Sequence, residues 1–63
     1  MTIASCVRKG YSFYLDGDYV DIIGRHKDTG LSFYVTHFKI STLRRYLRSL
    51  NMSLDDFFDK HSI

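Results

Sequence analysis

The chain has 63 residues, with nine Lys or Arg, seven acidic residues and a single cysteine, Cys6, and its formal net charge is +2. This length predicts a single small domain over residues 1–63, the lone thiol excludes an internal disulfide, and no stretch is long and apolar enough to cross a bilayer. We therefore expect a cytoplasmic protein, in the host cytoplasm if its origin is viral, whose mild charge allows nucleic-acid binding without requiring it.

The first half of the chain predicts an antiparallel sheet. Residues 3–7 are expected to form a short strand at its start. Three further runs are rich in Tyr, Phe, Val and Ile, which favour strands: 11–15, 19–25 and 31–38. Asp16-Gly17 lies between the first two of these runs, and an Asp-Gly pair there predicts a two-residue type I′ hairpin turn. The polar residues 26–30 separate the last two runs.

The predicted hairpin sets which side chains share a face. With that turn, Tyr14 lies opposite Tyr19 and Phe13 lies opposite Val20, and successive side chains alternate between the two faces. One face is expected to be the core face, with Tyr11, Phe13, Val20, Ile22, Leu31, Phe33 and Val35. The opposite face, called here the tyrosine face, is expected to present Ser12, Tyr14, Tyr19, Asp21, Ser32, Tyr34 and Thr36.

After residue 40 the spacing of apolar residues becomes helical. Ser41 is expected to cap a first helix that stops at Asn51, and Ser53 to cap a second, short helix. The predicted fold is α+β: a β-hairpin extended to a three-stranded antiparallel sheet, followed by two short C-terminal helices packed on one face. The expected core consists of Phe13, Val20, Ile22, Leu31, Phe33, Val35, Leu43, Leu47, Leu50, Phe57 and Phe58.

The C-terminal third resembles a known helical pair. The run from Ser41 to Leu47, followed by the run from Leu50 to Phe58, is similar to the last two helices of repressor-type helix-turn-helix domains. Those helices mainly pack rather than read bases, so the resemblance implies a way of joining two amphipathic helices and no DNA-reading residues. In outline, three strands followed by a helix also look like the DNA-binding domains of some integrases and plant transcription factors, which lay an open sheet face in the major groove.

The tyrosine face is the first candidate site. Tyrosine offers a large rigid area and a hydroxyl at low entropic cost, which suits a contact surface for another protein. The alternative is ordinary cross-strand aromatic pairing on a solvated face. The acids near the first turn disfavour a phosphate backbone on this face, so protein binding is placed ahead of nucleic-acid binding. The predicted protein-binding residues are Tyr14, Tyr19, Asp21, Tyr34 and Thr36.

A basic helix is the second candidate site. Arginines crowd one side of the first helix, and like charges four residues apart repel slightly. We expect the chain's own Asp55, Asp56 and Asp59 to relieve this repulsion, and phosphate groups are the alternative. The candidate nucleic-acid-binding residues are Lys39, Arg44, Arg45 and Arg48.

Catalytic, metal and cofactor sites are not expected. The cysteine and the three histidines lack zinc-like spacing, and His37 is expected to be structural and to face the core side. Three aspartates near the first turn, at positions 16, 18 and 21, do not match a calcium loop, because the glycine is misplaced and no Glu exists. No phosphate loop or nucleophile elbow is present.

Two functions follow as hypotheses. The first is a small non-enzymatic regulatory or inhibitory protein that binds another protein through the tyrosine face, or forms a homodimer through it. A chain of this size, taken as complete from Met1, is associated with viruses and mobile elements. The second is a small DNA- or RNA-binding domain that uses the basic helix on phosphate and the aromatic face on bases.

Overall fold

Three strands and three helices make up residues 1–61, the part of the chain that the computed structural model describes. In chain order they are α1 (Ile3–Arg8), β1 (Ser12–Asp16), β2 (Tyr19–Arg25), β3 (Ser32–Lys39), α2 (Ile40–Leu50) and α3 (Leu54–His61). The strands form one antiparallel sheet in the order β1-β2-β3, and two helices follow it. The predicted α+β fold is confirmed.

The N-terminal segment is a helix, so the strand expected for residues 3–7 is wrong. The side chain of Thr2 accepts a hydrogen bond from the Ser5 amide at 3.1 Å and caps α1. Ile3 and Cys6 are buried and Val7 packs against them. These positions are spaced by three and four residues, which is the period of a helix face and not of a strand.

The first hairpin turns one residue later than predicted. Asp16 pairs with Tyr19, so Gly17 and Asp18 form the loop. Gly17 has φ of 61° and Asp18 has no positive φ, which fits a type II′ turn with glycine first, and not type I′. Phe13 therefore pairs with Ile22 instead of Val20. The register differs by two residues, an even number, so every side chain of β1 and β2 keeps its expected face.

A β-bulge interrupts the pairing of β2 with β3. Ile22 pairs with Thr36 while Ile23 pairs with Tyr34, which leaves Val35 as the extra residue. After the bulge, each side chain of β3 lies on the face opposite to the one that simple alternation predicts. Thr36 therefore lies on the face of Ile22, and its predicted place on the tyrosine face is wrong. His37 pairs with Asp21 and lies on the other face, exposed, so its expected core position is also wrong.

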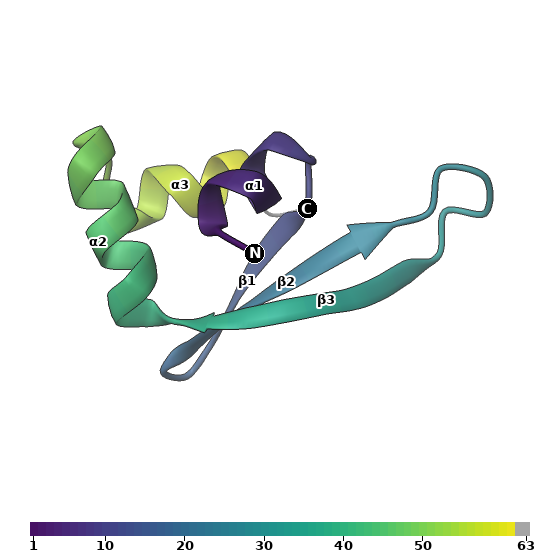
Figure 1. Ribbon diagram of the computed structural model, residues 1–63, viewed down its shortest axis with the longest axis horizontal. Coiled ribbons are helices and arrows are strands. Elements are labelled where there is room, and N and C mark those ends of the chain that lie inside the picture. Colours follow the sequence, from purple (N-terminus) through teal and green to yellow (C-terminus); the bar gives the residue numbers. More distant parts are fainter. Residues whose placement is uncertain (62–63) are drawn as a thin grey trace.

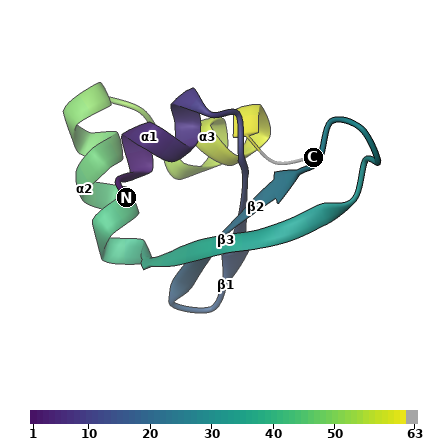
Figure 2. The ribbon, with the colours of Figure 1, turned by 45° about the vertical axis from the view of Figure 1, so that its right-hand side comes forward.

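All three helices pack on one face of the sheet (Figure 1). Seen after a turn of 45°, the helices still lie together on that side, and no described element covers the opposite face (Figure 2). Phe13 of β1 and Phe57 of α3 meet edge to face, with ring centroids 4.9 Å apart. The buried apolar core consists of Ile3, Cys6, Phe13, Val20, Ile22, Leu43, Leu47 and Phe57.

Three predicted core residues are exposed instead. Leu31 is 66 % exposed and Phe33 36 %, because the distal part of the β2–β3 hairpin extends past β1 and past the helices (Figure 1). Leu50, 51 % exposed, is the last residue of α2. Val35 and Phe58 are only partly buried.

The ends of the helices follow local rules with one exception. Asn51 ends α2, as predicted, and adopts the left-handed conformation, while the amide of Met52 donates to the carbonyl of Leu47 in a Schellman arrangement. Ser53 accepts a hydrogen bond from an amide of the first turn of α3. Ser41 does not cap α2, because that helix begins directly at Ile40, whose amide donates to the carbonyl of Asp18 at 2.9 Å.

None of the helices in residues 1–61 has the length and apolar character needed to cross a membrane.

Candidate functional site

The uncovered side of the sheet, called here the outer face, presents a grid of three rows of three residues. The rows follow directly from the register of the strands, because directly paired residues of an antiparallel sheet point to the same side. From the first turn outward, the rows are Asp16, Tyr19 and Lys39, then Tyr14, Asp21 and His37, then Ser12, Ile23 and Tyr34, and of these nine residues Ser12 is buried.

Four aromatic rings stand on this face. Tyr14 is 37 % exposed, Tyr19 43 % and Tyr34 58 %, and His37 is also exposed. They come from all three strands, so no flexible loop positions them. The structure thus brings together the three tyrosines that the sequence assigned to one face.

His37 links two of the tyrosines. Its Nδ1 and the Tyr34 hydroxyl share a hydrogen bond of 2.6 Å. Its ring also meets Tyr19 edge to face at a centroid distance of 5.3 Å. Simple alternation would place Tyr34 and His37, three residues apart, on opposite faces, and the bulge at Val35 is what puts them on the same one. Sequence reasoning missed His37 for this reason.

Asp21 occupies the centre of the grid. It pairs with Tyr14 on one side and with His37 on the other, and Tyr19 lies two residues before it on the same strand. Its side chain is half-buried, yet the carboxylate makes no hydrogen bond or ion pair with any of residues 1–61. The face carries two acids, Asp16 and Asp21, so an approaching anion would meet negative charge at its centre.

The basic helix is separate from this face. Arg44, Arg45 and Arg48 are exposed on the side of α2 away from the buried Leu43 and Leu47. Within residues 1–61 no Arg or Lys nitrogen pairs with a carboxylate, so the expected relief of the arginines by the acids of α3 does not occur. Lys39, the fourth predicted basic residue, lies on the outer face of the sheet instead, beside Tyr19.

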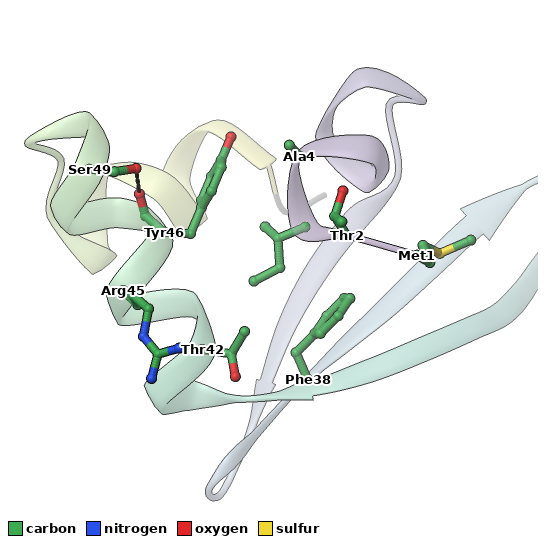
Figure 3. Close-up of a pocket in the computed structure, with 9 residues that line it drawn as sticks. Met1, Thr2, Ala4, Phe38, Thr42, Arg45, Tyr46 and Ser49 are labelled. Atoms are coloured by element: carbon green, nitrogen blue, oxygen red, sulfur yellow. Dashed lines mark hydrogen bonds between the residues drawn. The ribbon is translucent and has the colours of Figure 1, made fainter.

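A groove of about 470 Å³ opens between α1 and α2 (Figure 3). Phe38 and Tyr46 point into it from the strand and from α2, and Arg45 lies at its rim. Ser49 also lines the groove, and its hydroxyl donates a hydrogen bond to the Tyr46 carbonyl at 2.6 Å. This groove could not be expected from the sequence, because its second wall is the segment predicted to be a strand.

Two titratable groups, the buried Cys6 and the partly buried His61, belong to the core and not to a site. Burial raises the pKa of the Cys6 thiol, which is fully enclosed under the sheet. Burial, and then the charge of Lys60, lower the pKa of His61, whose ring lies 4.6 Å from that of Phe57. In the described part of the chain, no three His, Cys, Asp or Glu side chains gather closely enough to hold a metal ion.

Comparison with protein-family models, with curated proteins and with solved structures found no match for this chain.

Proposed function

We propose that this is a small non-enzymatic regulatory or inhibitory protein that binds another protein through the outer face of its sheet. The observation that carries the proposal is the set of four exposed aromatic rings on a sheet face that no described element covers. A solvated sheet face is usually polar, because only the opposite face has a core to join. This one instead keeps three tyrosines and an isoleucine, Ile23, outside the core.

Three of the four rings also contact one another before any partner arrives. Tyr34 and Tyr19 both contact His37, and each side chain stands on a strand of the sheet. Ordering a side chain on binding costs about 0.5–1.5 kcal/mol, so rings that are already ordered lose less. Tyrosines held this way are typical of the residues that dominate protein–protein affinity.

The mechanism would be steric. A rigid sheet face that occupies a partner's working surface blocks it without any chemistry, which suits a cytoplasmic regulator of viral or mobile-element origin. A second copy of the chain is the simplest alternative partner, because a two-fold dimer through the same face would bury the same rings. Sedimentation at several protein concentrations distinguishes the two arrangements.

Site-specific crosslinking tests the proposal. A photoreactive phenylalanine analogue replaces Tyr34 on the outer face or, as a control of similar exposure, Leu50 on α2. We expect a discrete adduct with a protein partner only from position 34. The purified partner should then bind the Tyr14→Ser/Tyr34→Ser variant more weakly by about 2 kcal/mol or more. Adducts only from position 50, or equal affinity for both forms, would contradict the proposal.

A second function is supported by a different observation. Three arginines of α2 have no acidic partner within residues 1–61, and phosphate groups of DNA or RNA would supply one. Binding to a short mixed-sequence duplex should then weaken as salt rises, with a log–log slope of about −0.9 for each phosphate contacted. Arg44→Gln/Arg48→Gln should flatten that slope, and Lys39→Gln, on another face, should change it less. No binding at low salt excludes this function.

A further inference from the structure

The centre of the outer face has the composition of a receptor for a positive charge. Asp21 is a partly buried residue whose carboxylate, still accessible to solvent, has no hydrogen-bonding or ionic partner in residues 1–61. Its cross-strand neighbours are the rings of Tyr14 and His37, and Tyr19 lies two residues before it on the same face of β2. At this central sheet position, with a ring on each neighbouring strand, an uncharged polar residue would be less costly to desolvate than a carboxylate.

The chain does not neutralise this carboxylate itself. Lys39 lies on the same face in the adjacent row, Arg25 is at the far end of β2 and His37 is the direct cross-strand neighbour, yet none of the three forms an ion pair with Asp21. When a partner covers the face, Asp21 will lose its remaining water. A buried carboxylate without a partner is strongly destabilising, so the covering surface must bring a donor with it.

We propose that Asp21, with Tyr14 and Tyr19 beside it, receives an arginine side chain from the partner protein. This inference rests on the proposed function and names the chemistry of the partner. The guanidinium group pairs with a carboxylate through two parallel hydrogen bonds and also stacks on aromatic rings. Lysine offers only a point charge for the same position, and a tyrosine ring attracts either cation through its negative face.

Other occupants fit this centre less well. A phosphate group would approach Asp21 and Asp16 with like charge, whereas the arginines on α2 offer it a better site. A second copy of this chain would place two outer faces together, and the two-fold axis would bring one Asp21 close to the other unless the copies were offset. A basic residue of a different protein meets neither obstacle.

Short capped peptides test the chemistry without knowledge of the partner. Ac-Ala-Arg-Ala-NH2 is titrated into the ¹⁵N-labelled full-length chain, and the isosteric but uncharged citrulline peptide is the matched control. We expect saturable amide shifts centred on Asp21, Tyr14 and His37 with a dissociation constant in the millimolar range. The citrulline peptide should bind roughly tenfold more weakly, as the loss of one charge-assisted pair predicts.

Two isosteric variants on the same face locate the effect. Asp21→Asn should weaken arginine-peptide binding roughly tenfold, whereas Asp16→Asn, which removes the same charge at the edge of the grid, should leave it within about twofold. Asp21→Glu retains the charge and should bind measurably, which distinguishes loss of the charge from the effect of any substitution at position 21. Equal binding by the two Asn variants, equal binding of the two peptides, or shifts located elsewhere would overturn the proposal.

The partner captured by crosslinking separates this inference from the function on which it rests. If Tyr14→Ser/Tyr34→Ser loses that partner while Asp21→Asn keeps it at full affinity, the outer face is the binding surface and the arginine receptor is wrong. If the tyrosine variant keeps the partner, the proposed function itself is wrong, whatever the peptides show.

Discussion

Replacing Gly24 by alanine tests how tightly the β2–β3 hairpin is packed beyond the helices. A Cβ atom at Gly24 would lie 2.5 Å from Cζ of Phe33 and 2.8 Å from its Cε2, both closer than real contacts allow. Phe33 pairs directly with Gly24, and its ring also meets those of Tyr11 and His26, at centroid distances of 6.4 and 4.7 Å. The ring must therefore move when a methyl group is added.

Two opposing effects determine how far Gly24→Ala changes the free energy of unfolding. Glycine in a strand is less stable than alanine by about 0.5–1 kcal/mol, and Gly24 has no positive φ that alanine would resist. Overpacking costs about 1–3 kcal/mol, and a partly exposed ring that can swing outward places this case in the lower half of that range. We therefore expect Gly24→Ala to lower the free energy of unfolding by about 1 kcal/mol, measured by urea denaturation followed by circular dichroism.

The decisive measurement repeats the substitution without the ring. In a Phe33→Ala background the three closest contacts of the methyl group are removed, so Gly24→Ala should raise the free energy of unfolding by about 0.5–1 kcal/mol. The sign of the effect should thus reverse between the two backgrounds, which a double-mutant cycle reports directly. A loss of stability of the same size in both backgrounds would refute the proposed packing of Phe33 on the β2 backbone.

Three further predictions concern the core and the end of α2. Folding lowers the pKa of His61 below 6.5. Its stabilising contribution is therefore fully present above that pH and is lost as the pH falls through the lowered pKa. In His61→Gln, the free energy of unfolding measured in urea should accordingly depend less on pH between 7 and 5. An equally steep decline in the variant would assign the acid sensitivity to other groups. The enclosed, raised-pKa thiol of Cys6 should react with an aromatic disulfide at pH 8 about a hundredfold or more slower than in concentrated urea, and a native rate near the unfolded one would contradict its burial. At Asn51, where φ is 55°, Asn51→Ala should lower the free energy of unfolding by about 1 kcal/mol while Asn51→Gly should not, and similar losses in thermal unfolding would argue against the left-handed cap.

Much of the candidate site could be predicted from alternation within single strands. Tyr14, Tyr19 and Asp21 lie on one face in either register of the first hairpin, because the predicted and observed registers differ by an even number of residues. The error in the turn was therefore harmless to the site. The cause of that error was local, since Asp-Gly and Gly-Asp are both good loop pairs and share the same glycine.

The part of the site on β3 could not be predicted in the same way. A shift of the register by an odd number of residues moves each side chain to the other face of the sheet. The bulge at Val35 is such a shift, so Thr36 lies on the core face and His37 on the outer face. A signal was present in the sequence, because Phe38 is one residue out of phase with Phe33 and Val35. The position of Phe38 indicates an irregularity somewhere in the strand, but it does not show where the strand pairing is interrupted.

Taken alone, the sequence determined the features that depend on neighbours along the chain. These are the three strands of the sheet, the positive φ at Gly17, the end of α2 at Asn51 and the apolar face of α2 that includes Leu43. The tertiary structure decided which surfaces stay uncovered. Three features depend on pairing between residues far apart in the sequence. They are the covering of the sheet by α1, the extension of the β2–β3 hairpin past β1 and the helices, and the contact of His37 with Tyr34. Such pairings are chosen by the total area buried across the whole domain, a quantity that no local segment contains.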